Sequence, residues 1–175
     1  MNTIIGMVLE VGKAKKNMEL NNAKNELNRQ RLNERMEILG LKEKRVIPGD
    51  GNCQFASVSD QLFDTLEHAN LVRRRAIDWL IKNKNWRLPN GAVLSDFAHD
   101  QSWDEFCGEL GRNGIWGNHL TLVAIAEYFG SKIYVISSVD GEYLINISPT
   151  ITKSQKLILL SHYAEYHYGS LAINK

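Results

Sequence analysis

Residues 48–62, PGDGNCQFASVSDQL, decide the fold of this chain. The stretch opens with a dense turn signal over residues 48–52, where Pro, Gly, Asp and Asn follow one another. An apolar run then repeats at Phe55, Val58 and Leu62, which is the spacing of one helix face. We therefore predict a glycine-rich turn that leads directly into a helix, with Cys53 at or near the N-terminus of that helix.

Cys53 stands where a cysteine can act as a nucleophile. The thiolate is the attacking form, and a helix N-terminus is expected to lower the pKa of the Cys53 thiol. Backbone N–H groups of the preceding turn would be free to bind an oxyanion. His167, on a predicted strand near the end of the chain, is a candidate base, and cysteine before histidine is the order of papain-like hydrolases. Taken alone, these residues leave a buried structural cysteine and a packed histidine as open alternatives.

The composition is that of a soluble globular protein. The 175 residues are 43% hydrophobic and 23% charged, which suits one domain with a helical extension. The formal net charge is only +1, so we expect no nucleic-acid partner. No apolar run approaches the roughly 20 residues that span a bilayer, so we expect no membrane contact either.

The cysteine count and the spacing of potential metal ligands argue against a disulfide-stabilised protein and against a metalloprotein. Two cysteines, Cys53 and Cys107, are too few for a disulfide scaffold and indicate a reducing compartment. No group of His, Cys or carboxylate residues has the spacing of metal ligands. We therefore expect no metal site and no cofactor, and we expect the chain to be a monomer. Cys107 lies on the apolar face of a predicted short helix and is interpreted as core.

The chain divides unevenly by charge. Residues 1–45 carry 10 basic and 6 acidic side chains, whereas the remainder carries 11 and 14. We interpret residues 1–31 as an N-terminal helical arm and residues 32–175 as the functional domain. The arm helix is predicted from about residue 13 to residue 39, with Gly40 as its stop. Its basic residues are interpreted as a solvated face, as is the run Arg73-Arg74-Arg75 further on.

The functional domain begins with helices and ends with strands. Further helices are predicted over residues 68–84, 103–111 and 118–129, the last with Asn118 as its N-cap. Strands are predicted over residues 132–138, 142–147, 156–161 and 166–171. This order indicates an α+β domain with a small, mostly antiparallel sheet flanked by helices.

Three motifs resemble those of the ovarian-tumour (OTU) family of deubiquitinating cysteine proteases. The first is the string Asp50-Gly51-Asn52-Cys53, the second is WGNHLTL over residues 116–122, and the third is the pair His167-Tyr168 followed by Ser170-Leu171. They occur in the family's order and cover roughly residues 32–172. The resemblance implies the papain-like OTU cysteine-protease fold. It also implies hydrolysis of isopeptide bonds at the C-terminus of ubiquitin, with ubiquitin or polyubiquitin as the partner.

The resemblance also implies roles for individual residues. Cys53 matches the family's nucleophile and His167 its general base. Asp50 matches a position that helps to build the oxyanion hole and that some members count in the catalytic triad. The backbone amides from Asp50 through Gly51 and Asn52 to Cys53 match the oxyanion donors. Trp116 and Asn118 match residues that line the cleft, and the Trp116 indole is a candidate wall for the ubiquitin tail.

Two positions depart from the family pattern. Asn118 stands in the second motif where Asp is frequent, and the other departure follows the histidine. Many relatives place Asn or Asp two residues after the histidine to orient its ring, and this chain has Gly169 there. Asp50 is the favoured replacement, with Asn118 and Glu165 as alternatives. Glu165 is expected to share a strand face with the histidine, because side chains in a strand repeat with period two. His162 is the alternative base.

The sequence leads to an OTU-type thiol isopeptidase working in the cytoplasm, or in the host cytosol if it is a secreted microbial effector. Two alternatives stay open. One is a catalytically weak or inactive OTU-like module that binds ubiquitin or a ubiquitin-like protein, which the glycine at position 169 motivates. The other is a non-catalytic interaction protein, associated with nucleic acid through the basic arm, whose affinity would fall steeply with salt.

Overall fold

The protein is an α+β domain built on one sheet, and its computed structural model describes residues 2–174, with side chains from residue 13 onward. The five strands of the sheet are β1 (Leu41–Arg45), β2 (Ile133–Ser137), β3 (Leu144–Ile147), β4 (Ile158–Tyr163) and β5 (His167–Ile173). The helices are α1 (Asn2–Ile38), α2 (Cys53–Phe63), α3 (Ala69–Lys82), η1 (Leu94–Ala98, a 3₁₀ helix), α4 (Trp103–Gly111) and α5 (His119–Phe129).

The strands lie in the order β1-β5-β4-β2-β3. Three of the four pairings are antiparallel, and β2 and β4 run parallel to each other. The parallel pair is possible because β3 and a long loop intervene between these strands in the chain, which allows a crossover. Strand β4 occupies the centre of the sheet, where it overlaps the strand predicted over residues 156–161.

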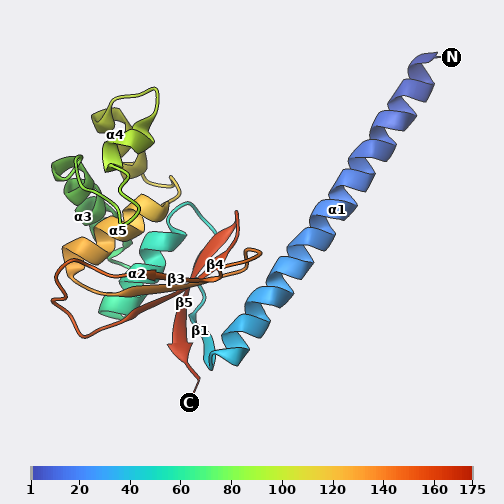
Figure 1. Ribbon diagram of the computed structural model, residues 1–175. Coiled ribbons are helices and arrows are strands. Elements are labelled where there is room, and N and C mark those ends of the chain that lie inside the picture. Colours follow the sequence, from blue (N-terminus) through green and yellow to red (C-terminus); the bar gives the residue numbers. More distant parts are fainter. Residues whose placement is uncertain (1, 175) are drawn as a thin grey trace.

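The main core lies between the sheet and helices α2, α3, α4 and α5. Phe55 and Val58 of α2, Leu80 of α3 and Ile125 of α5 pack there with Leu160 of β4, and each is fully shielded from solvent. Cys107 of α4 belongs to the same cluster, which confirms its interpretation as core. Figure 1 shows these helices gathered on one side of the strands.

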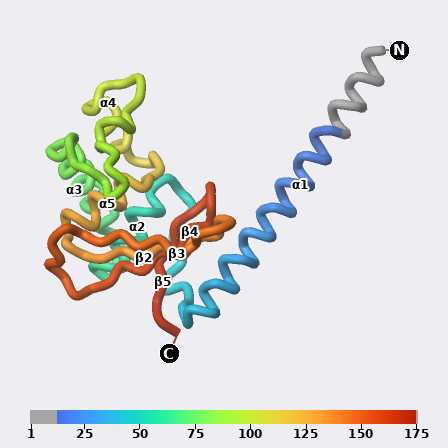
Figure 2. Tube along the Cα trace, in the orientation of Figure 1, coloured from blue at the N-terminus to red at the C-terminus, as the bar shows by residue number. Residues whose placement is uncertain are grey.

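Helix α1 lies against the opposite face of the sheet at its C-terminal end only. Leu32 packs on Ile136 and Leu171, and the Tyr163 hydroxyl donates a hydrogen bond of 2.8 Å to the Asn25 carbonyl. Residues 13–24 are exposed, and Figures 1 and 2 show this part of α1 running away from the domain. None of the described helices is long and apolar enough to cross a membrane.

The predicted boundary after residue 31 stays a prediction. Helix α1 is continuous across it and ends at Ile38. Gly40, with a φ of 64°, follows as the predicted helix stop. The helix begins earlier than the predicted start at residue 13. Strand β1 was not predicted, because its sequence LKEKR has no apolar alternation. It pairs with β5 at the edge of the sheet, where charged side chains are common.

Candidate active site

The turn before α2 places Cys53 at the first residue of the helix, as predicted. The Asp50 carboxylate accepts a hydrogen bond of 2.9 Å from the Asn52 amide, and the Cys53 amide donates one of 3.3 Å to the Asp50 carbonyl. These two bonds close the turn locally. Two of the amides matched to oxyanion donors, those of Asn52 and Cys53, therefore donate within the turn.

Strand β5 brings the predicted base to the nucleophile. The Tyr168 amide donates a hydrogen bond of 3.4 Å to the Cys53 Sγ atom, so the residue directly before Tyr168, which is His167, lies at the same place. Cys53 and His167 both line a pocket of about 220 Å³. The other residues of that pocket are Trp116, Gly117, Asn118, His162, Glu165, Tyr166 and Tyr168. Sequence positions more than a hundred residues apart thus meet in one cavity.

The Cys53 thiol is held in its neutral form. Burial raises its pKa, and the charge of Asp50 raises it further. Hydrogen bonds from the backbone at Tyr168 and Gln54 lower the pKa but do not offset the burial. The expectation that the helix N-terminus would lower the pKa is therefore wrong in its net direction, because only 4% of the Cys53 surface is exposed and desolvation dominates.

His167 is suited to accept the proton of that thiol. Burial lowers the pKa of the His167 imidazole, and the carboxylates of Glu43 and Asp50 oppose the effect without cancelling it. The ring is therefore neutral at pH 7, which is the form that a general base needs. A raised pKa on Cys53 and a lowered one on His167 both favour the uncharged pair at rest.

No candidate for orienting the His167 ring contacts that ring by a hydrogen bond among the described residues. The Asp50 carboxylate is bound to the Asn52 amide, and the Asn118 side chain caps α5 by accepting from the Thr121 amide at 3.1 Å. Glu165 does not share a strand face with His167, so that expectation is wrong. It lies in the turn between β4 and β5 with a φ of 66°, where strand alternation does not apply, although it lines the pocket.

The space that a side chain at position 169 would need is occupied by a residue of the neighbouring strand β4. A Cβ atom on Gly169 would lie 2.5 Å from the Ser161 Oγ atom of β4, and the two residues are paired in register. The serine hydroxyl thus lies where an orienting side chain would begin. Nothing else in the described part of the chain replaces that side chain by direct contact with the imidazole.

His162, the alternative base, lines the same pocket. Its ring stacks on Tyr168 with the centroids 4.7 Å apart, and its Nδ1 atom lies 3.0 Å from the Ser137 hydroxyl. Burial lowers the pKa of His162 as well. The site therefore holds two neutral imidazoles. The Nδ1 atom of one of them, His162, already shares a hydrogen bond with the Ser137 hydroxyl.

Gln54, directly after the nucleophile, was missed by the sequence reasoning. Its side chain is 1% exposed, donates to the Asn118 carbonyl at 3.2 Å and accepts from the Thr121 hydroxyl at 2.6 Å. A Cβ atom on Gly117 would lie 2.2 Å from the Gln54 amide oxygen. The residue next to Cys53 therefore fixes the loop that carries Trp116 and Asn118 across the pocket. Trp116 itself is 52% exposed.

Arg73 was also misjudged. The run Arg73-Arg74-Arg75 was interpreted as solvated, but Arg73 is only 3% exposed. Its guanidinium donates to the Gly51 carbonyl at 3.1 Å and to the Asn52 side-chain oxygen at 2.8 Å. The acceptors for this arginine are provided by distant segments, so the run itself carried no signal of burial.

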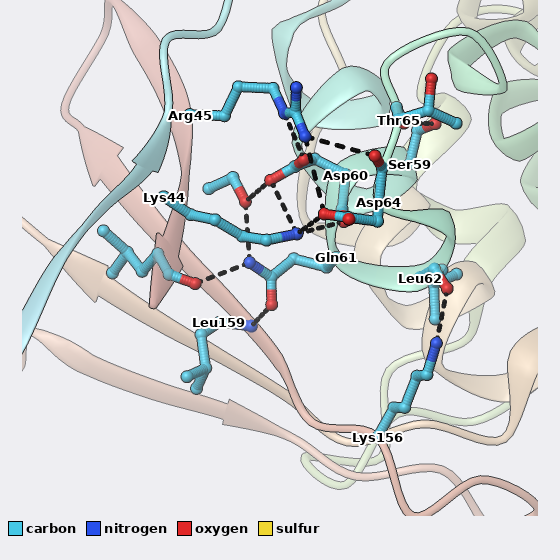
Figure 3. A network of polar contacts seen from close by, with 12 residues as sticks. Lys44, Arg45, Ser59, Asp60, Gln61, Leu62, Asp64, Thr65, Lys156 and Leu159 are labelled. Atoms are coloured by element: carbon cyan, nitrogen blue, oxygen red, sulfur yellow. Dashed lines mark hydrogen bonds and ion pairs between the residues drawn. The ribbon is translucent and has the colours of Figure 1, made fainter. Parts of the chain in front are cut away.

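A second polar cluster ties α2 to the strands behind the site. Asp60 of α2 is fully buried and accepts from the Ser170 hydroxyl of β5 at 2.5 Å. Arg45 of β1 donates to the same carboxylate at 2.6 Å, and the Lys44 ammonium lies 3.3 Å from it. Figure 3 shows Lys44, Arg45 and Asp64 gathered around Asp60. The cluster fixes the helix that carries Cys53 to the strand that carries His167.

Helices packed on a mixed sheet, with a thiol and an imidazole opening into one pocket, place the protein among the cysteine proteases. A family model described as OTU-like cysteine protease matches residues 48–170. The chain belongs to that family. The predicted family and fold class are thereby confirmed.

Individual relatives agree with this assignment. The chain is 40% identical over 142 residues to OVARIAN TUMOR DOMAIN-containing deubiquitinating enzyme 9 of Arabidopsis thaliana, a match covering 81% of this chain and 39% of that protein. It is 36% identical over 146 residues to enzyme 10 of the same series and organism, covering 83% and 38%. The chain thus spans about two fifths of the length of these relatives.

Solved structures share the fold. The OTUD1 OTU domain superposes with a TM-score of 0.65 and 14% identity, covering 87% of this chain and 99% of that one. An OTU domain solved in complex with ubiquitin superposes with a TM-score of 0.55 and 18% identity, covering 75% and 69%. At these identities the likeness concerns the fold.

Proposed function

We propose that this protein is a deubiquitinating thiol isopeptidase. It would hydrolyse the bond between the C-terminal glycine of ubiquitin and a lysine, including bonds within polyubiquitin chains. The observation that carries the proposal is the Cys53 thiol, which opens with His167 into one pocket. The names of the relatives, which are deubiquitinating enzymes, support ubiquitin as the partner. The proposal places the protein in a reducing compartment, the cytosol of its own cell or of a host, because Cys53 reacts as a free thiol.

The geometry supports a two-stage reaction. His167 accepts the thiol proton of Cys53 as the sulfur attacks the isopeptide carbonyl carbon. The resulting oxyanion collapses, the lysine amine leaves with the proton from His167, and a thioester remains on Cys53. Water then attacks the thioester carbonyl while His167 accepts a proton from it. The C–S bond breaks, the Cys53 sulfur leaves and takes the proton back from His167, and ubiquitin is released with a free C-terminal carboxyl group. No cofactor enters this sequence of steps.

The shape of the site suits an extended glycine-rich tail. The pocket measures about 220 Å³, and its lining includes Trp116, Gly117 and residues of the β4–β5 turn. Such a space admits backbone but few side chains. The exposed indole of Trp116 provides an apolar wall above it, and a Gly-Gly terminus fits this restriction.

The proposal is tested with ubiquitin that carries an electrophile in place of its C-terminal carboxylate. We expect a covalent adduct that Cys53→Ala abolishes, while Cys107→Ser leaves it intact because Cys107 is fully buried in the core. A folded protein that forms no adduct would contradict the isopeptidase proposal for ubiquitin.

A second candidate is an OTU-like module that binds ubiquitin with weak or no hydrolysis. The observation that favours it is Gly169, since no hydrogen bond among the described residues orients the imidazole in its place. This candidate predicts saturable binding of unmodified ubiquitin by calorimetry, together with an adduct rate near that of Cys53→Ala. Binding with rapid adduct formation would exclude it.

A further inference from the structure

Arg73 of α3 is a buried cation without a carboxylate partner. Only 3% of its surface is exposed, and no ion pair within 4.0 Å forms among the described residues. Its Nε atom is buried without a hydrogen-bond partner. Burying a charge in this way is unfavourable unless other interactions compensate for it. The contacts of its guanidinium indicate what that compensation is.

Two of the four contacts of the guanidinium are to the turn before Cys53, and the other two are to α4 and α2. The Nη2 atom donates to the Gly51 carbonyl and the Asn52 side-chain oxygen, at 3.1 and 2.8 Å. The Nη1 atom donates to the Leu110 carbonyl at the end of α4, at 2.7 Å. The guanidinium carbon lies 4.0 Å from the centre of the Phe55 ring on α2, a cation–π contact. One side chain thus links α3, α4 and α2 to the turn.

The turn that Arg73 holds has little room to adjust. A Cβ atom on Gly51 would lie 1.6 Å from the Gly114 carbonyl oxygen, so the two backbones are in direct contact. The Asn52 side-chain oxygen, already bound to Arg73, also accepts from the Gly114 amide at 3.0 Å. Because a peptide unit is planar and trans, fixing the Gly51 carbonyl also fixes the direction of the Asn52 N–H.

The charge of Arg73 is also placed to act on the reaction. Burial lowers the pKa of the guanidinium, whereas negative charge on Asp50 and Cys53 favours its charged form. The effect is reciprocal, so a cation at this position favours negative charge on the sulfur and on the nearby oxyanion. No neighbouring carboxylate neutralises it by direct contact, and its buried surroundings weaken screening by solvent.

We propose that Arg73 is a positioning residue of the catalytic centre, which orients the peptide units before Cys53 through the Gly51 carbonyl and Asn52 and stabilises the negative charge that develops there. The proposal rests on the proposed function in taking Cys53 as the nucleophile. It concerns the thiol itself, however, and is measured without ubiquitin.

The first measurement is the rate of Cys53 alkylation by iodoacetamide between pH 6 and pH 11, a range that extends above the raised pKa of this thiol, followed by mass spectrometry of the Cys53 peptide. Alkylation of Cys107 is measured separately, because this residue lies on a different peptide in the digest. Burial raises the pKa of the Cys107 thiol to about 11. Besides Arg74, which is varied as the control, the ionisable groups that face Cys53 or Arg73 and share the profile are Asp50, Asp78, His162, Glu165, His167 and Tyr168. All of them are unchanged in the variants below, so a change in the profile reports on Arg73.

We expect Arg73→Gln to move the alkylation midpoint of Cys53 upward by about one pH unit. On ubiquitin with a fluorogenic C-terminal amide, kcat should fall about 100-fold, as for loss of an oxyanion-stabilising group, with KM within about twofold. Arg73→Lys keeps the charge but loses the fork of donors. It should keep the wild-type midpoint and lower kcat about tenfold. Arg74→Gln, the exposed neighbour on the same helix, should match wild type in both measurements.

Specific outcomes would overturn the proposal. If Arg73→Gln is folded by circular dichroism and keeps the wild-type alkylation profile, the residue is merely structural. If Arg73→Gln does not fold, Arg73→Lys decides, and a wild-type kcat in that variant contradicts the positioning role. A chain without activity on ubiquitin that still shows the shifted alkylation profile contradicts the proposed function and supports the role of Arg73.

Discussion

The buried carboxylate of Asp60 should be a principal source of stability, and Asp60→Asn measures it. The side chain is fully shielded and accepts from the Ser170 hydroxyl at 2.5 Å. A hydrogen bond to a charged acceptor contributes roughly 1.5–3 kcal/mol. Asparagine removes the charge and sets an NH2 group in place of one of the two accepting oxygens, so the change should cost about 2 kcal/mol at pH 7. Lys44 and Arg45 remain 28% and 44% exposed, so water can take over their share and we assign them no part of the cost.

The assay is urea unfolding followed by circular dichroism. With a slope of about 2 kcal/mol per molar urea, the Asp60→Asn midpoint should lie about 1 M below that of wild type. The matched control is Asp64→Asn, because Asp64 contacts the same Lys44 and Arg45 but is 79% exposed. Its midpoint should coincide with that of wild type, since exposed ion pairs contribute little.

The pH dependence gives the same prediction a second test. Burial raises the pKa of Asp60, but hydrogen bonds from Ser170, Arg45 and Lys44 outweigh it and lower the pKa overall. A carboxylate with a lowered folded-state pKa contributes its stability above its unfolded-state pKa, about 3.9, and loses it as pH falls through the folded-state value. The gap between wild type and Asp60→Asn should therefore close below about pH 4. Equal midpoints for Asp60→Asn and Asp64→Asn at pH 7 would refute the reasoning.

Three further predictions concern helix α1, the turn before Cys53 and the N-cap of α5. Leu32→Ala should destabilise the protein by about 2–3 kcal/mol in the same urea assay, because the side chain is 8% exposed where α1 meets the sheet. Gly51→Ala should slow labelling by electrophilic ubiquitin by about 100-fold, since its Cβ would overlap the Gly114 carbonyl. Gly49→Ala, with nothing within 4 Å of its Cβ, is the control and should label at the wild-type rate. Asn118→Ala should cost about 1 kcal/mol in urea unfolding through loss of the α5 N-cap.

Features that depend on short-range signals could be predicted from the sequence. Gly40 and Gly130 follow helices with φ values of 64° and 61°, and a left-handed residue after a helix is a local requirement. The Asn118 side chain bonds an amide three residues away. Cys53 begins α2 because a turn and an apolar run adjoin there. In each case the residue and the contacts that give it its role lie within a few positions.

Features that depend on distant partners could not be predicted. The charged segment of β1 is a strand because β5, some 130 residues later, offers free backbone groups. Arg73 is buried because Gly51, Asn52 and Leu110 provide its acceptors. Glu165 lies in a turn where a strand was expected, since the chain must reverse between β4 and β5. Propensity and periodicity carry no information on such pairings.

The same distinction governs the chemistry of the site. A helix N-terminus considered alone predicts a lowered pKa for Cys53, but the packing of β5 over the thiol adds a larger, opposing desolvation. Burial in the same pocket lowers the pKa of His167. In the proposed reaction the resting pair is therefore neutral, and charge separates only as the sulfur attacks. The residues that matter for the rate are then those that favour the separated charges. The buried cation Arg73 lies where it favours negative charge on Cys53. The imidazolium of His167 has no such support, because Gly169, two residues further along the same strand, has no side chain to accept a hydrogen bond from it.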